Sequence, residues 1–290
     1  MTASNTAAVP HLRGTWLDTR TGAPCGQGEL LARLAERRVV LIGETHDVAE
    51  IHRWQLHVCA FLHVLRPRMA VGFEMFPRRL QPVLDAWVAG RYTTAGFLAV
   101  SEWDDVWGFP PELYLPLFHF CRQMRVPMLA LNCHRPLVTR VGREGWEAIP
   151  EGDRDGLTPA APATAAYRRY LFDLVSSGPA AMAAGPDDPA FDRFVRAQQT
   201  WDRAFACNIA RALHEDAGRL VVGIIGRGHL EYGHGTPFQL RDLGIEDIAV
   251  LLPSDEPRAD PERIRGIADA IFRLDRPEPP APRRSQAKRP

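Results

Sequence analysis

Two short motifs share the spelling Gly-x-x-His: GETH at residues 43–46 and GRGH at residues 226–229. One carboxylate, Glu44, lies inside the first motif, and another, Glu74, follows an apolar run elsewhere in the chain. Two imidazoles and a carboxylate suit zinc, manganese or iron with open coordination positions. Without a metal, a glutamate held near a histidine can activate water for attack on an ester or amide. The candidate metal ligands are His46, Glu74 and His229, and the candidate hydrolytic residues are Glu44, His46, Glu74 and His229.

Short apolar runs rich in β-branched residues must position these groups. The pattern predicts five buried strands, which end at Gly43, Met75, Asn132, Gly226 and Leu252. Helical patterns lie between them, the clearest over 47–65. Buried strands that alternate with helices are typical of an α/β fold in which a mostly parallel sheet is sandwiched by helices.

Polar groups follow four of these predicted strands. The carboxyl ends of parallel strands form one edge of an open sheet, and ligands bind in the crevice outside that edge. We therefore expect one pocket to collect Glu44, His46, Glu74, Asn132 and His229. A single histidine at a strand end is ordinarily a structural residue, but the coincidence of four strand ends favours a functional site. The glycines leave room for a sharp turn and for a ligand.

The stretch 133–218 between the third and fourth of these strands is long and mostly helical, and we expect it to form an insertion or lid over the sheet. One of its helical patterns places Gln198, Trp201 and Asp202 on a single face. Polar groups that share a helix face with an aromatic residue indicate contact with a polar pocket. Packing of this face against the rest of the protein, without a functional role, is an equal alternative.

The domain organisation follows from composition along the chain. We expect one domain over 31–275, preceded by an N-terminal extension over 1–30. The proline-rich, basic tail over 276–290 is typical of disorder.

Charge and hydropathy exclude some classes of partner. The 290 residues carry 35 basic and 35 acidic side chains, so no net charge points to nucleic acid. No stretch approaches the roughly 20 apolar residues of a membrane span. The chain as written starts without a secretory signal or a lipobox cysteine, so we expect a cytoplasmic protein. A truncated N-terminus would instead leave room for a periplasmic or membrane-anchored lipoprotein.

Five ordered motifs resemble those of the haem-binding uptake proteins of the ChaN family, within the superfamily of Tiki proteases, erythromycin esterases and TraB proteins. They are LIGETHD at 41–47, FEMF at 73–76, ALN at 130–132, QQTWDRAFA at 198–206 and GRGHLEYGHGTP at 226–237. The resemblance extends from about Val39 to Leu252. It implies an α/β fold with a helical lid, haem as cofactor, a homodimer around haem, and a role in iron uptake, storage or transfer.

The resemblance also implies roles for residues. It places the polar centre of the superfamily on Glu44, His46, Glu74 and His229, and it puts the haem iron on a tyrosine that no motif identifies. Tyr232 is the first candidate, with Tyr114 and Tyr92 behind it, while histidine or arginine would hold the propionates. The candidate haem-binding residues are Tyr232, His234, His46, Tyr114 and Arg227. A hydrolase that uses the GETH, Glu74 and GRGH groups is the alternative function, so whether the chain is an enzyme stays open.

Overall fold

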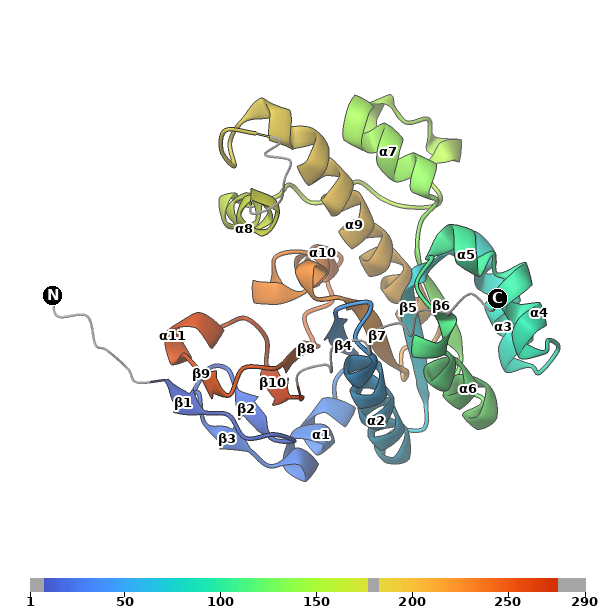
Figure 1. Ribbon diagram of the computed structural model, residues 1–290. Helices are drawn as coiled ribbons and strands as arrows, with labels where there is room; N and C mark the ends of the chain where they lie inside the picture. Colours follow the sequence, from blue (N-terminus) through green and yellow to red (C-terminus); the bar gives the residue numbers. More distant parts are fainter. Residues whose placement is uncertain (1–7, 177–182, 276–290) are drawn as a thin grey trace, which may run out of the picture.

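A central eight-stranded sheet organises the computed structural model, which describes residues 8–176 and 183–275 (Figure 1). The strand order is β3-β2-β10-β8-β4-β7-β5-β6. All neighbours from β10 to β6 are parallel, whereas β2 and β3 are antiparallel at one end. The strands are β2 (Trp16–Asp18), β3 (Pro24–Cys25), β4 (Val39–Glu44), β5 (Met69–Pro77), β6 (Met128–Asn132), β7 (Leu220–Gly226), β8 (Ile248–Ser254) and β10 (Ala270–Arg273). A separate pair joins β1 (Val9–Pro10) to β9 (Arg258–Ala259).

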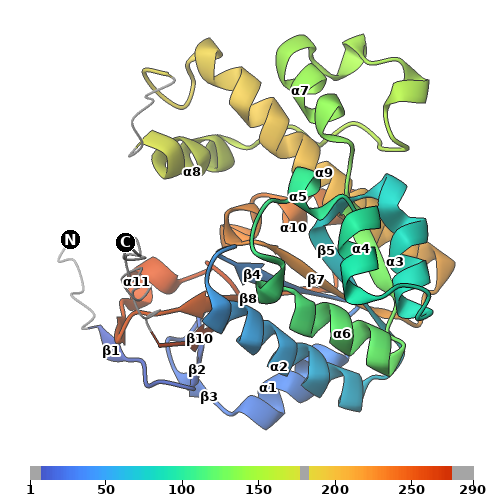
Figure 2. The same ribbon diagram turned by 45° about the vertical axis from the view of Figure 1, so that its right-hand side comes forward.

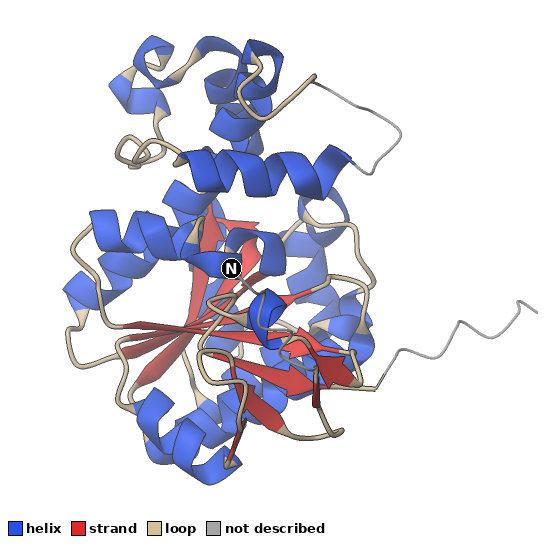
Figure 3. Cartoon of the chain, turned by 90° about the vertical axis from the view of Figure 1, so that its left-hand side faces the viewer, coloured by secondary structure: helices blue, strands red, loops and turns tan. Residues whose placement is uncertain are grey.

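The predicted α/β fold with a mostly parallel sheet is confirmed. Every residue of β4, β5 and β7 is buried, because helices cover both faces of the sheet (Figure 3). Alternate residues of β4 serve the two layers: Val40 and Ile42 join one core cluster, and Val39 and Leu41 join the other.

Helices pack on both faces (Figures 1 and 2). The first layer holds α1 (Gln27–Ala35), α2 (Ala49–Leu65), α3 (Gln81–Val88), α4 (Thr94–Val100), α5 (Trp103–Val106) and α6 (Leu115–Met124). On the opposite face, α9 (Asp192–Glu215) and α10 (Thr236–Asp242) bury Phe205, Ile209 and Leu240 against the strands. A short helix, α11 (Pro261–Ile264), lies near the small β1–β9 pair. Among the described residues, none of the helices combines the length and the apolar character that a membrane crossing requires.

Residues 133–176 and 183–218 are mostly helical, and they rise beyond the carboxyl ends of the strands (Figure 2). They form α7 (Arg135–Glu144), α8 (Ala165–Ser176) and α9, with short 3-10 helices at Trp146–Ala148, Glu151–Asp153 and Pro189–Phe191. The lower part of α9 belongs to the core of the sheet, where Ile209 and Leu213 are buried. Its upper part carries the helices of the insertion.

Two segments extend the sheet beyond the five predicted strands. β2 and β3 come from the segment that we separated as an N-terminal extension, and β10 joins them to β8. These strands are two to four residues long, which is too short for a hydrophobic period to be recognised in the sequence. The expected disordered tail lies outside the described residues.

The position of β7 brings the two Gly-x-x-His motifs together. β7 follows β6 in the chain but is inserted between β4 and β5, and Glu44 is paired in register with Gly226. The GETH and GRGH turns therefore leave the same edge of the sheet side by side, with β5 and Glu74 next to them.

Candidate functional site

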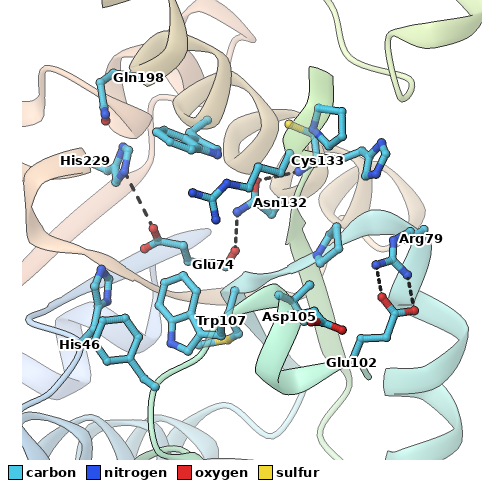
Figure 4. Close-up of a pocket in the computed structure, with 18 residues that line it drawn as sticks. His46, Glu74, Arg79, Glu102, Asp105, Trp107, Asn132, Cys133, Gln198 and His229 are labelled. Carbon is cyan, nitrogen blue, oxygen red and sulfur yellow. Dashed lines mark hydrogen bonds and ion pairs between the residues drawn. The ribbon is translucent and has the colours of Figure 1, made fainter. Parts of the chain in front are cut away.

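A cavity of about 460 Å³ lies at the carboxyl ends of β4, β5, β6 and β7, beneath the insertion (Figure 4). Six of the residues singled out in the sequence line it: His46, Glu74, Asn132, Gln198, Trp201 and His229. Glu44 lies below His46 and Asp202 lies beside His229, each within hydrogen-bond distance of its histidine. The structure thus brings together the groups that the strand-end argument expected to converge.

The GETH turn holds His46 against a buried carboxylate. Glu44 is only 1% exposed, and its Oε1 lies 2.9 Å from His46 Nδ1. The same oxygen accepts a hydrogen bond from the Tyr114 hydroxyl at 2.8 Å, and Oε2 accepts one from Gln55 Nε2 at 3.1 Å. With Nδ1 committed to Glu44, the Nε2 atom of His46 is the ring nitrogen left for the cavity.

Burial lowers the pKa of His46, but the hydrogen bond to Glu44 and the charge of Glu74 outweigh it, so the pKa is raised overall. A second imidazole, His52 of α2, braces this turn. Its Nε2 lies 3.1 Å from the His46 carbonyl oxygen, and its Nδ1 lies 3.0 Å from Gln55 Oε1.

Glu74 forms the floor between the two histidines. It is 7% exposed, its Oε2 accepts a hydrogen bond from the Gly226 backbone N–H, and its Oε1 lies 3.9 Å from His229 Nε2 (Figure 4). Burial raises the pKa of Glu74, and the attraction of His229 and His46 offsets only part of this. A carboxyl group with a raised pKa can donate as well as accept a proton.

Gly226 explains why GRGH begins with glycine. A Cβ atom at this position would lie 3.1 Å from His46 Cε1 and 3.2 Å from Glu74 Oε2. The absence of a side chain therefore lets the two motifs and Glu74 approach one another.

His229 is oriented by Asp202 of α9. Asp202 is fully buried, and its Oδ1 lies 2.9 Å from His229 Nδ1. Its Oδ2 accepts a hydrogen bond from the Tyr167 hydroxyl at 2.6 Å, so α8 is joined to the site through Asp202. Burial lowers the pKa of His229, but the charge and hydrogen bond of Asp202 outweigh it and raise the pKa to about 9.

The walls of the cavity are aromatic and its rim is charged. The ring centroids of Trp107 and Phe109 lie 4.7 Å and 5.3 Å from that of His46, and Trp201 faces the cavity from α9. Arg135 lines the cavity at the start of α7. A second arginine, Arg79, also lines it and is paired with Glu102 (Figure 4).

The candidate haem ligands other than His46 lie outside this cavity lining. Tyr114 is fully buried beneath His46, with its hydroxyl bound to Glu44. Tyr232 is 40% exposed, and its hydroxyl donates to the Arg263 carbonyl at 3.3 Å. Its ring packs near His234, with centroids 5.8 Å apart. The other two candidates are elsewhere: Arg227 is paired with Glu231, and the Tyr92 carbonyl accepts a hydrogen bond from Arg122.

A bare metal centre gains no support from the geometry. Across residues 8–176 and 183–275, no group of three or more His, Cys, Asp and Glu side chains is arranged to hold a metal ion. The site instead consists of two imidazoles, each fixed at Nδ1 by a buried carboxylate, with a buried carboxyl between them.

Some contacts of the site escaped the sequence analysis. Gln55 reaches Glu44 from α2, and Tyr167 reaches Asp202 from α8. Tyr114 was predicted as a haem ligand, but from its position just before α6 it donates a hydrogen bond to Glu44 instead. The available signal for Gln55 was its position on the same predicted helix that GETH opens. Trp107 and Phe109 lie in a loop whose aromatic residues are equally typical of ordinary packing.

The fold and the site define a class: α/β proteins whose ligand cavity lies at the carboxyl edge of the sheet, between paired histidine motifs and a helical insertion. The chain belongs to the haem-binding uptake family of the Tiki superfamily, ChaN, whose family model matches residues 30–240. The resemblance seen in the motifs is thereby confirmed.

Three solved structures are similar to this chain to different degrees. The fold is shared with the structure of cofacial heme binding to ChaN of Campylobacter jejuni, which has a TM-score of 0.68 and 20% identity over 90% of this chain and 98% of that one. The type III effector HopBA1 matches with a TM-score of 0.50 and 9% identity over 94% of this chain and 99% of that one. A mutant of the erythromycin esterase EreC, in its open conformation, gives a TM-score of 0.48 at 14% identity, over 82% and 76% of the two chains. No curated protein matches the chain in sequence.

Proposed function

We propose that this chain binds haem in the cavity at the carboxyl ends of β4, β5, β6 and β7. The observation that supports this most directly is the combination of aromatic walls, a basic rim and an oriented histidine in one cavity. Its volume, about 460 Å³, lies in the range of small-molecule and cofactor pockets. Membership of the haem-binding family supplies the class of ligand.

The lining fits a flat apolar ring that carries two carboxylates. Trp107, Phe109 and Trp201 offer apolar surface for such a ring from two sides of the cavity. Arg135 lies on the cavity lining without an ion-pair partner among the described residues, so its guanidinium is available to a propionate. Arg79 is already paired with Glu102 and is the weaker candidate for that role.

We assign the iron contact to His46. His46 Nε2 would hold the iron atom that a bound haem would supply. The His46 side chain is 31% exposed, and its Nδ1 is hydrogen-bonded to Glu44. A histidine that ligates a metal commonly has its other ring nitrogen bonded to a carboxylate in this way. Within the part of the chain that the structure describes, the cavity lining includes no tyrosine. Histidine at this position therefore replaces the tyrosine that the family resemblance implies.

The test is a haem titration followed by absorption spectroscopy. The purified chain is expected to develop a Soret band that saturates with added haem, and His46→Ala is expected to weaken binding and change the spectrum. Wild-type protein without any spectral change at micromolar haem would contradict haem binding. An unchanged His46→Ala spectrum would leave haem binding intact and overturn only the assignment of the ligand.

Transfer or storage of haem for iron uptake follows as the proposed role, with a homodimer that encloses the haem. The partly open cavity would leave one edge of a bound ring accessible, and a second copy could cover that edge. Light scattering with and without haem tests this directly. A mass that stays at one chain, 32.4 kDa, after haem saturation would refute the dimer.

A hydrolase acting on an ester or amide is the second candidate. The two carboxylate-held imidazoles on either side of Glu74 favour it, because this arrangement can activate water and protonate a leaving group. Turnover of a chromogenic ester that disappears in both His46→Ala and Glu74→Ala would support it. Full activity in those variants would exclude the mechanism.

A further inference from the structure

Two arginines lie together in a recess that shares no lining residue with the haem cavity. Arg78 directly follows β5, and Arg211 belongs to α9. Both line a recess of about 500 Å³ along β6, which is the outermost strand at that end of the sheet. The feature is therefore separate from the site described above.

The two guanidinium groups meet at Gly156. A Cβ atom at this position would lie within 3.5 Å of both Arg78 Nη1 and Arg211 Nη2. Gly156 has a φ of +68°, which a residue with a side chain rarely adopts, so the close approach depends on glycine. The two positively charged guanidinium groups therefore lie close enough to repel each other.

No ion pair compensates this repulsion. Arg78 Nη1 donates to the Asp155 carbonyl at 2.9 Å, and Arg211 Nη1 donates to Asn208 Oδ1 at 2.8 Å. Within residues 8–176 and 183–275, neither guanidinium forms an ion pair. Burial and the charge of Arg78 lower the pKa of Arg211, while Glu215 and Asp155 attract it from beyond ion-pair distance.

The Asp155 carbonyl and the Asn208 amide hold the two guanidinium groups in place but leave most of their N–H donors available for a ligand. A guanidinium carries five N–H donors, and the bonds above use one on each arginine. Two carboxylates, Asp85 and Glu215, also line the recess. Asp85 Oδ1 accepts a hydrogen bond from Gln81 at 2.9 Å, and among the described residues neither carboxylate forms an ion pair with Arg78 or Arg211. Arg211 further lines a neighbouring recess of about 600 Å³ with Arg38 and His214, and no acidic residue lines that second recess among the described residues. Arg38 therefore adds a further guanidinium to the surface around Arg211.

We propose that Arg78 and Arg211 together bind a small phosphate-type oxyanion, either inorganic phosphate or the phosphate of a monoester. Guanidinium forks match the oxygens of such an anion, and a doubly charged ligand would relieve the repulsion between the two arginines. The ligand would bridge α9, which carries Asp202, and the end of β5, which carries Glu74.

The test is a titration of the full chain with inorganic phosphate at constant ionic strength, followed by calorimetry or phosphorus NMR. We expect saturable binding in the range of about 1 mM, weakened about 10-fold or more in Arg78→Gln and in Arg211→Gln. Arg91→Gln is the matched control, because Arg91 is exposed and forms no ion pair among the described residues. It is expected to bind phosphate like the wild type.

Phosphate binding that persists in both glutamine variants would overturn the proposal, as would the absence of saturation by ~10 mM phosphate. A phosphomonoester is expected to compete with inorganic phosphate, whereas acetate is expected to compete weakly. Equal competition by acetate would contradict the preference for a doubly charged anion. Circular dichroism of each variant separates a lost site from a lost fold.

Discussion

Asp202 and His229 come from different elements, a helix of the insertion and the turn after β7, yet Asp202 Oδ1 lies 2.9 Å from His229 Nδ1. Asp202 is fully buried, so its carboxylate is shielded from solvent, while His229 faces the cavity. The contact joins the helical insertion to the sheet edge beside the cavity. It also leaves His229 Nε2 directed at Glu74.

The Asp202–His229 pair predicts a stability change with pH. The folded-state pKa of His229, about 9, lies above its ordinary value of 6.5, so the pair stabilises the fold fully below that ordinary value. This contribution is lost as the pH rises from about 6.5 through about 9. We expect the free energy of unfolding to fall by as much as about 3 kcal/mol over that window.

Denaturant unfolding across the window measures this change. His229→Gln is the comparison, since it lacks the titrating imidazole and is expected to show a flatter profile between the same pH values. Identical profiles for the two proteins would show that His229 does not titrate in this range.

Tyr167 is expected to support the site through Asp202. Tyr167→Phe removes a buried 2.6 Å hydrogen bond to Asp202 Oδ2 and should lower the free energy of unfolding by about 1–2 kcal/mol. Tyr232→Phe is the matched control, because its hydroxyl is exposed and its hydrogen bond is 3.3 Å long. Equal losses in the two variants would argue against a special role for the Asp202 network.

Gly226 is expected to tolerate no side chain. Gly226→Ala places a Cβ atom against His46 and Glu74 and should destabilise the fold by about 1–3 kcal/mol while weakening haem binding. Gly228→Ala is the control within the same motif, since its Cβ would meet Leu174 at an ordinary 3.5 Å. Thermal unfolding and haem titration of both variants measure the difference. A Gly226→Ala protein with wild-type stability and affinity would mean that the turn can relax.

Glu44 is expected to act through His46. Glu44→Gln keeps the size of the side chain but removes the negative charge, so the pKa of His46 should fall and haem affinity should drop about 10-fold. Glu50→Gln, on the surface of α2 where Glu50 pairs with Arg53, is the control. Proton NMR of the apoprotein follows the imidazole independently of haem. A His46 pKa that does not move in Glu44→Gln would show that Glu44 does not tune this imidazole.

The sequence predicted the edge of the sheet well because strand ends carry a local signal. Glu44, Glu74 and His229 each follow an apolar run, and parallel strands place such ends together. The position of β7 between β4 and β5 could not be predicted from the sequence, because it depends on the path of the chain between β6 and β7.

Contacts that depend on helix packing were equally out of reach. Tyr114 was considered as a haem ligand, but in the structure its hydroxyl lies under His46 and binds Glu44. Nothing in the spacing of Tyr114 indicates that α6 packs beside α2 with this hydroxyl toward the GETH turn. The same holds for Tyr167 and Asp202, which are 35 residues apart.

The most direct test of the proposed haem site is one haem titration performed on the wild type, His46→Ala and Tyr232→Phe. We predict that Tyr232→Phe keeps the affinity and the absorption spectrum of the wild type, whereas His46→Ala binds haem more weakly and has a changed spectrum. The reverse result, with His46→Ala unchanged and Tyr232→Phe impaired, would place the haem at the α8 face beside His234 and contradict the cavity as the haem site.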